Sequence, residues 1–180
     1  YTQYNKLNEL DVFSSLKLIE GTQGQVWSFR KIDGRLFCAH TNGLLEILPD
    51  FRIRHPYRVN TGVFRTLEAT INGKQIQIII TYDNLLILNR TTGELNSMRQ
   101  ISDPIYNAEV DHLGNIWLET ASRGVYKCRL NDEQNAFRYY TYYGNEKDSS
   151  LPARLQLFKS GGRILFLGND QFYIYDEVND

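Results

Sequence analysis

Four copies of one pattern, separated by steps of 41, 40 and 47 residues, constrain the fold of this chain more than any other feature. In each copy, a run rich in aliphatic and aromatic residues leads through a short polar or glycine turn into a second such run. The paired runs are 35–41 with 44–48, 76–81 with 84–88, 115–120 with 125–130, and 163–167 with 171–175. The steps are measured between equivalent residues of the second runs, Leu44, Leu85, Val125 and Phe172. Self-similarity at a fixed period indicates a repeat architecture.

Each copy also contains an earlier run, which ends in a tight turn of its own. These runs are 26–32, 66–71, 107–111 and 155–159, and a further run follows each of the first three copies at 52–59, 94–101 and 137–143. Asp33-Gly34 and Asn72-Gly73 favour two-residue hairpin turns, because both turn residues need positive φ. We expect further strand-pairing turns at Asn42-Gly43 and Arg123-Gly124.

Four strands per unit at this period predict an all-β fold, a β-propeller fragment of about four four-stranded antiparallel blades. The predicted blades are 20–60, 61–102, 103–144 and 145–180, with residues 1–19 as the outer strand of a preceding blade. That strand is the run from Val12 to Ile19, and only Asn5 to Leu16 hints at a helix. The core between blades should contain Trp27, Phe29, Leu36, Phe37, Ile78, Ile80, Val110, Ile116, Trp117, Leu118, Leu157, Leu165 and Phe166.

The pattern is cut at both ends of the sequence, so we expect the chain to be part of one longer β-propeller domain. Two arrangements are open for the chain by itself. The run 12–19 could pair with 172–175 and close a small ring. Otherwise the blades form an open arc whose end sheets expose apolar faces and self-associate. We favour the arc, because a blade interface suited to a larger ring has the wrong wedge angle for four blades.

Composition narrows the classes of partner. The chain has 180 residues, a formal net charge of −1 and 42% hydrophobic residues, which is typical of a globular protein without attraction for nucleic acid or anionic membranes. No run approaches the ~20 apolar residues of a membrane span. Cys38 and Cys128 have neither metal-site nor disulfide-framework spacing, so we expect two buried free thiols.

The third copy, Asp111-His-Leu-Gly-Asn-Ile-Trp-Leu-Glu-Thr-Ala-Ser-Arg-Gly-Val-Tyr126, resembles the two-component regulator propeller repeat. Trp27, the run from Asp33 to Gly43 and the connector Asp148-Ser-Ser-Leu-Pro152 look like the same family. The second and fourth copies depart from it, because neither has a tryptophan in its central strand. The resemblance covers nearly the whole chain but is sharp only between Asp111 and Tyr126.

The resemblance implies the periplasmic sensor domain of a bacterial membrane-bound regulator. In that family a β-sandwich domain and a membrane helix follow, and the output is a histidine kinase or a helix-turn-helix DNA-binding domain. The implied function is extracytoplasmic ligand sensing in signal transduction and transcription regulation, with an oligosaccharide as the ligand. The alternative is a propeller scaffold for protein–protein interaction or dimerisation without a small ligand.

Propeller loops that join the second strand to the third, and one blade to the next, meet on one face. Their side chains include hydrogen-bonding groups suited to sugar hydroxyls. The candidate ligand-binding residues are His40, Asn42, Tyr82, Asp83, Tyr106, Glu119, Arg123 and Asp170. The same residues could instead be merely solvated.

No motif predicts catalysis, a metal site or a cofactor. The three histidines, His40, His55 and His112, occupy different repeat positions, so zinc is not expected. Asp111 and Asn115 favour a hairpin turn held by Asx side-chain bonds over a cation loop. We interpret Trp117 as an inter-blade wedge, with a sugar-stacking platform as the alternative. The run 139–143 contains four tyrosines, which should alternate between the two faces of an outer strand.

Overall fold

The computed structural model describes residues 17–177, and every regular element in that part of the chain is a β-strand. Blade 1 contains β1 (Val26–Ile32), β2 (Arg35–His40), β3 (Gly43–Ile47) and β4 (Ile53–Arg54). Blade 2 contains β5 (Val63–Ile71), β6 (Lys74–Thr81), β7 (Leu85–Asn89) and β8 (Leu95–Met98). Blade 3 contains β9 (Ile105–Val110), β10 (Ile116–Thr120), β11 (Val125–Leu130) and β12 (Phe137–Tyr143). Blade 4 contains β13 (Gln156–Ser160), β14 (Arg163–Gly168) and β15 (Gln171–Ile174).

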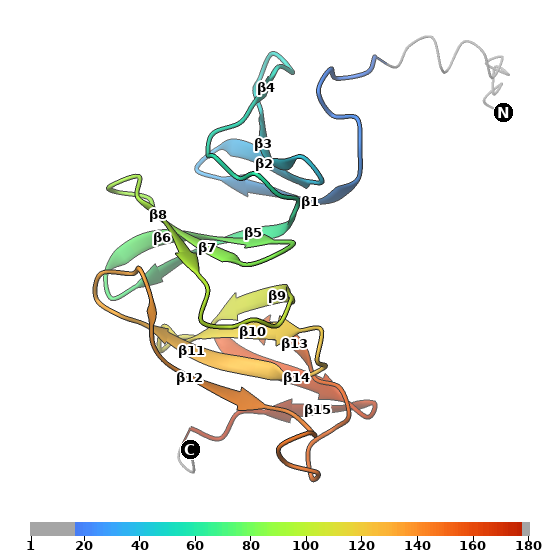
Figure 1. Ribbon diagram of the computed structural model, residues 1–180, viewed down its shortest axis with the longest axis vertical. Helices are drawn as coiled ribbons and strands as arrows, with labels where there is room; N and C mark the ends of the chain where they lie inside the picture. The colour runs from blue at the N-terminus through green and yellow to red at the C-terminus, as the bar shows by residue number, and fades with distance from the viewer. Residues whose placement is uncertain (1–16, 178–180) are drawn as a thin grey trace, which may run out of the picture.

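Each blade is an antiparallel sheet in which consecutive strands pair, so the order in space is the order in the sequence (Figure 1). Three sheets have four strands and the last has three within the described residues. The predicted all-β class and the run of four blades are therefore confirmed. The β1, β5, β9 and β13 strands form the inner edge of the assembly, because β1 contacts β5, β5 contacts β9 and β9 contacts β13.

The first hairpin turns of blades 1 and 2 have the predicted positive φ at both of their central residues. Asp33 and Gly34 have φ values of 49° and 77°, and Asn72 and Gly73 have 51° and 73°. Arg123 also adopts positive φ, at 67°. The β2–β3 turn lies one residue earlier than expected, at residues 41–42, because Gly43 already pairs with His40 in the ladder.

Two outer elements differ from the sequence expectation. The β4 strand covers two residues rather than the run 52–59, because Pro56 lacks an N–H and disfavours continuation from His55. Most of the predicted strand from Val12 to Ile19 lies outside the described residues, and its last three residues, 17–19, are not in a strand.

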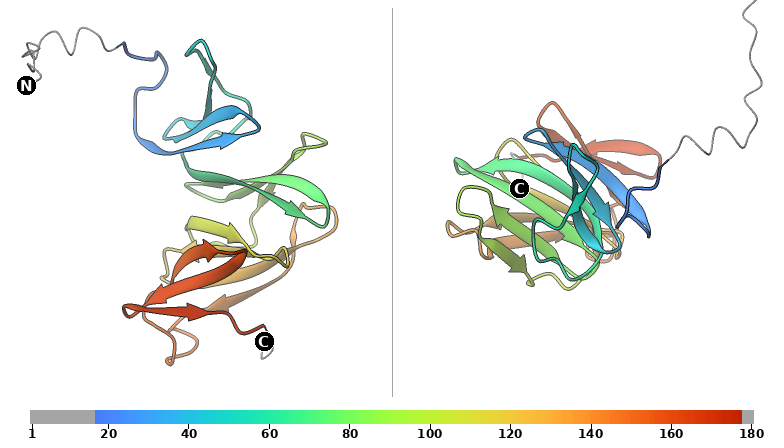
Figure 2. Two further views of the ribbon diagram at one scale, coloured as in Figure 1. Left: turned by 180° about the vertical axis from the view of Figure 1, so that it is seen from behind. Right: turned by 90° about the horizontal axis from the view of Figure 1, so that it is seen from above.

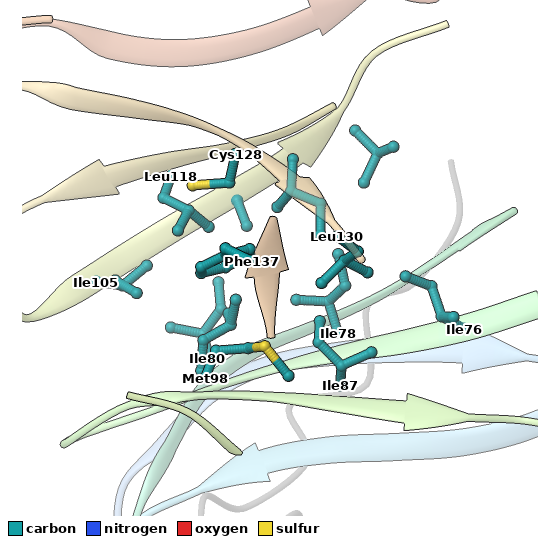
Figure 3. Packing of buried hydrophobic residues seen from close by; sticks show 14 of the residues in the cluster. Ile76, Ile78, Ile80, Ile87, Met98, Ile105, Leu118, Cys128, Leu130 and Phe137 are labelled. Carbon is teal, nitrogen blue, oxygen red and sulfur yellow. The ribbon is translucent and has the colours of Figure 1, made fainter. Parts of the chain in front are cut away.

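Three apolar cores separate the four blades. The largest lies between blades 2 and 3, where Ile76, Ile78 and Ile80 of β6 face Leu118 of β10 and Cys128 of β11 (Figure 3). A smaller core joins Phe37 and Leu44 of blade 1 to Ile79 of blade 2. The third core packs Trp117 of blade 3 against blade 4. Both cysteines are buried and free, as expected.

Most predicted core residues are buried, but four are not. Trp27, Phe29 and Leu36 have exposed fractions of 42%, 57% and 37%, and Leu165 is only half-buried. Phe29 and Leu36 lie on the opposite face of blade 1 from Phe37, which is the residue that packs on blade 2. Strand alternation therefore directs them away from the neighbouring blade.

The blades form an open arc rather than a closed ring. Blade 1 and blade 4 lie at opposite ends of the long axis in Figure 1 and in the left view of Figure 2. The outward face of blade 4 exposes Phe158, Phe172 and Ile174, with exposed fractions of 45%, 70% and 66%. Of the two arrangements that the sequence left open, residues 17–177 form the arc with apolar end faces, and most of the run 12–19 lies outside them.

Candidate ligand-binding groove

The inner strands of the first three blades share a local irregularity near their first residues. Each contains a β-bulge, and the residue that lacks a partner in the ladder is aromatic. The three residues are Trp27 in β1, Phe64 in β5 and Tyr106 in β9. A bulge redirects the side chain of its extra residue, so the same device presents an aromatic ring from three successive blades.

These three rings form one cluster with Tyr82 from the β6–β7 loop. The Phe64 ring lies 5.0 Å from the Trp27 ring, 4.6 Å from Tyr82 and 5.7 Å from Tyr106, measured between centroids. The Trp27 Nε1 donates a hydrogen bond of 2.6 Å to the Tyr82 hydroxyl. The Tyr82 ring rests on Gly62, where a Cβ atom would lie only 2.4 Å from it. Residue 62 must therefore be glycine for Tyr82 to support the cluster.

A groove of about 520 Å³ runs beside this cluster along the inner strands. Its lining residues are Trp27, Ser28, Phe64, Arg65, Tyr106, Asn107, Glu119 and Arg154. Trp27 and Tyr106 expose 42% and 48% of their surface, so both residues are accessible to a ligand. We call this site the inner-strand groove.

The residue after each bulge bridges to the next blade. The Ser28 hydroxyl donates to the Phe64 carbonyl at 3.1 Å, which connects blades 1 and 2. The Arg65 guanidinium pairs with the Glu109 carboxylate at 2.7 Å and donates to the Asn107 Oδ1, which connects blades 2 and 3. The Asn107 Nδ2 donates to the Leu157 carbonyl at 3.3 Å, which connects blades 3 and 4.

Glu119 is the acidic group at the blade 4 end of the groove. It is buried, and its Oε2 accepts hydrogen bonds from the Leu157 N–H at 3.1 Å and from the Asn107 Nδ2 at 3.5 Å. The exposed Arg154 guanidinium lies 3.8 Å from the other carboxylate oxygen. The groove thus combines aromatic faces with fixed donors and acceptors, which is an arrangement suited to a ligand with apolar faces and hydroxyl edges.

Comparison with known proteins identifies the fold. No protein-family model and no curated protein sequence matches the chain. Solved structures do match. The extracellular domain of a putative hybrid two component system from B. thetaiotaomicron superposes with a TM-score of 0.64 at 15% identity, over 88% of this chain and 21% of that one. A catalytically inactive virginiamycin B lyase from Staphylococcus aureus gives a TM-score of 0.57 at 14% identity, over 92% and 56%.

The WD40 β-propeller domain of Doa1 also matches, with a TM-score of 0.53 at 13% identity, over 82% of this chain and 49% of that one. This chain is an arc of β-propeller blades. It spans about one fifth of the length of the two-component domain. That domain is of the kind whose repeat the sequence between Asp111 and Tyr126 resembles, so sequence resemblance and fold agree.

The propeller brings three of the eight sequence-predicted ligand residues together. Tyr106 and Glu119 line the inner-strand groove, and Tyr82 supports its aromatic cluster. The other five lie elsewhere: Asn42 and Asp83 are exposed in loops, Arg123 and Asp170 occupy turns, and His40 is buried. Arg123 borders a separate hollow that Asn145 and Glu146 also line.

His40 lies outside the inner-strand groove and stabilises the β2–β3 turn. Its Nδ1 accepts a hydrogen bond of 3.0 Å from the Asn42 N–H, and a Cβ at residue 24 would lie 2.8 Å from its ring. Thr81 and Thr120, which end the equivalent strands, also bond to backbone groups across their turns. The Nε2 of His40 is buried without a partner among the described residues, but it faces the glycine segment rather than the groove.

The predicted ligand residues did not include Trp27, Phe64, Arg65, Asn107 or Arg154, because the prediction was based on loops. It placed ligand contacts in loops, whereas these side chains come from strands or from the connector before β13. A signal was present in the repeats: an aromatic residue is followed by a polar one at residues 27–28, 64–65 and 106–107. The bulge that turns the aromatic ring toward the groove has no sequence signature of its own.

Within residues 17–177, no group of three or more His, Cys, Asp or Glu side chains could hold a metal ion. The described part of the chain contains no helix long and apolar enough to cross a membrane.

Proposed function

We propose that this chain is part of an extracytoplasmic, ligand-sensing propeller in a bacterial membrane-bound signal-transduction regulator, with an oligosaccharide as the ligand. The module binds rather than catalyses, and it acts from the periplasmic side. Support comes from the sequence resemblance, from the shared fold with an extracellular domain of a two component system, and from the inner-strand groove.

The observation that carries the proposal is the recurring bulge. Three blades each place an aromatic residue at the same point of the inner strand, followed by a polar residue. Sugar rings have apolar faces and hydroxyl edges, so recognition needs aromatic surface and hydrogen-bonding groups side by side. Trp27 and Tyr106 supply exposed rings, and Ser28, Asn107 and Arg154 supply polar groups.

Calorimetric titration of the chain with a panel of neutral oligosaccharides tests this function. At least one should bind, and Trp27→Ala and Tyr106→Ala should each weaken binding about tenfold, because each removes a stacking surface. Tyr140→Ala is the matched control, since Tyr140 is a similarly exposed ring on the outer strand β12. Equal losses in all three variants, or no binding by any member of the panel, would contradict the proposal.

The second candidate function is a scaffold for protein–protein contact or dimerisation, and the exposed apolar face of blade 4 favours it. Phe158, Phe172 and Ile174 present a sheet surface of the kind that neighbouring blades cover elsewhere in the arc. A scaffold would associate through this face and leave the inner-strand groove without a role. In that case Trp27→Ala would have no binding phenotype, whereas polar substitutions in β15 would abolish association.

A further inference from the structure

A second groove lies at the opposite end of blade 3 from the inner-strand groove. It has a volume of about 480 Å³ and lies where the β5–β6 and β9–β10 turns approach strands β11 and β12. Its lining residues are Asn72, Leu113, Asn115, Lys127, Arg129, Leu130, Asp132, Arg138 and Tyr139. Blades 2 and 4 flank blade 3, so this groove does not arise from an uncovered end of the arc. We call it the basic groove.

Its charge is opposite to that of the chain as a whole. Three basic side chains, Lys127, Arg129 and Arg138, line the groove with a single acid, Asp132, whereas the formal net charge of the chain is −1. Within the described residues, neither Arg129 nor Arg138 forms an ion pair. A concave site with an excess of arginine attracts anions and raises their local concentration.

The Arg129 side chain is held in place by neutral partners. Its guanidinium donates to the Leu113 carbonyl and to the Asn115 Oδ1, the latter at 3.3 Å. The Asn115 amide is itself fixed by the Asp111 carboxylate at 2.9 Å. Because guanidinium carries five N–H donors, Arg129 keeps donors for a further acceptor, while its bonds to the Leu113 backbone and the Asn115 side chain reduce its mobility.

An aromatic ring stands beside the arginines. Tyr139 lies directly opposite Arg129 in the β11–β12 ladder, and half of its surface is exposed. An arginine pair next to an exposed ring matches an acidic sugar, because the arginines bind the oxyanion and the ring packs against the sugar face. A simple inorganic anion would make no use of Tyr139.

We propose that the basic groove is a second binding site and that it takes the carboxylate or sulfate group of an acidic oligosaccharide. Arg129 and Arg138 hold the oxyanion, and Tyr139 packs on the sugar ring. The negative charge of Asp132 repels the bound oxyanion and limits the affinity of the groove for the acidic oligosaccharide. The basic groove is separate from the inner-strand groove, so an experiment can contradict the proposal for one groove and leave the proposal for the other intact.

Calorimetric titration of the chain with three tetrasaccharides tests this site: an oligogalacturonate, a heparin fragment and a neutral maltotetraose. The galacturonate reports carboxylate binding and the heparin fragment reports sulfate binding. At least one acidic probe should bind more tightly than the neutral one, and its affinity should fall as salt is raised. Arg138→Gln should weaken that binding about tenfold, because it removes a charge-assisted pair, and Asp132→Asn should strengthen it.

Arg99→Gln is the matched control, since Arg99 is an exposed arginine that does not line the groove. Arg138→Lys separates charge from geometry, because lysine retains the charge but not the planar fork. The melting temperature of each variant should equal that of the wild type, which shows that lost binding is not lost folding. Equal affinities for acidic and neutral probes, or equal effects of Arg138→Gln and Arg99→Gln, would overturn the proposal. Loss of acidic binding in Trp27→Ala with none in Arg138→Gln would overturn it as well and would assign the ligand to the inner-strand groove.

Discussion

The hydrogen bonds of Asp111 explain several residues of the third repeat, the copy that most resembles the two-component regulator propeller family. Its Oδ1 accepts hydrogen bonds from the Leu113 and Asn115 N–H groups at 3.0 and 2.8 Å. Its Oδ2 accepts from the Asn115 Nδ2 at 2.9 Å and from the Trp117 Nε1 at 2.8 Å. One carboxylate therefore holds the β9–β10 turn and orients the indole that packs against blade 4. The expectations of an Asx-stabilised hairpin and of Trp117 as an inter-blade wedge are both confirmed.

Trp117 should contribute to stability rather than to ligand binding. It is 1% exposed and packs edge-on against Phe166 and Tyr175 of the last blade. Trp117→Ala should lower the free energy of unfolding by ~3–5 kcal/mol, because it leaves a cavity. Trp117→Phe should cost less, since it loses the Asp111 bond but keeps most of the packing. Urea denaturation measures both, and a wild-type midpoint in the alanine variant combined with lost ligand binding would favour the stacking role.

Glu46 should make blade 1 sensitive to acid. Hydrogen bonds from Arg35 and Arg54, together with their positive charges, lower the pKa of this buried carboxyl from 4.5 to about 2. Since the folded pKa lies below the unfolded one, the stabilisation is complete above about pH 5 and is lost as pH falls from 4.5 toward 2. Glu46→Gln should therefore cost on the order of 2 kcal/mol at pH 7 and much less near pH 2. Denaturation midpoints across this range measure the difference, and a constant difference at all pH values would contradict the assignment.

At the level of the strands and turns, two local features each recur in three of the four blades. Two-residue turns at residues 33–34, 72–73 and 161–162 combine positive φ with at least one glycine. Bulges at Trp27, Phe64 and Tyr106 redirect aromatic rings from the inner strands. The turns fix the register of each hairpin, and the bulges locally break that register to form the groove. In blades 1 and 2 the same hairpin therefore contributes to packing and shapes the inner-strand groove.

The β14–β15 turn also has positive φ at both of its central residues, but neither of them is glycine. Asn169 and Asp170 have φ values of 49° and 59°, a conformation that costs less for glycine than for aspartate. Asp170→Gly should therefore raise the free energy of unfolding by about 0.5 kcal/mol, which a thermal melt can detect. Asn42→Gly, in a turn whose non-glycine residues do not have positive φ, is the control and should not stabilise. A lower melting temperature for Asp170→Gly would show that the aspartate side chain contributes to the turn.

On the scale of the whole molecule, the arc has an inner edge, a rim and two end faces. Side chains connect the inner strands from blade to blade, as Arg65 does with Glu109 and Asn107. The interfaces between blades contain three apolar cores, whereas the end faces carry exposed rings such as Phe29 and Phe172. Apolar sheet faces of this kind mark interaction surfaces.

We expect the chain to self-associate through the outward face of blade 4. Phe172 and Ile174 expose 70% and 66% of their surface on the edge strand β15, and edge strands with apolar residues promote pairing. The double variant Phe172→Ser, Ile174→Thr should shift the chain toward monomer in multi-angle light scattering. Tyr140→Ser on the rim is the control and should leave the mass distribution unchanged. A monomeric wild type at high concentration would contradict this expectation.

The sequence by itself determined the class of fold, because turn chemistry and strand periodicity are local properties. Asp33-Gly34 and Asn72-Gly73 favour two-residue hairpin turns, and the 40-residue period indicates repeated four-stranded units. The buried position of Trp117 also followed, since an apolar central strand in such a unit must face another sheet. The sequence further indicated Tyr82, Tyr106 and Glu119 as candidate ligand residues.

The tertiary structure alone decided which faces are covered and where the groove lies. Trp27 was assigned to the core because it sits in an apolar strand, but a bulge turns it to the surface. Phe29 is exposed because no sheet packs on its side of blade 1 within the described residues. Arg65, Asn107 and Arg154 are far apart in sequence and meet only because successive inner strands align. Burial and convergence depend on contacts between distant segments, and no local pattern of residues encodes them.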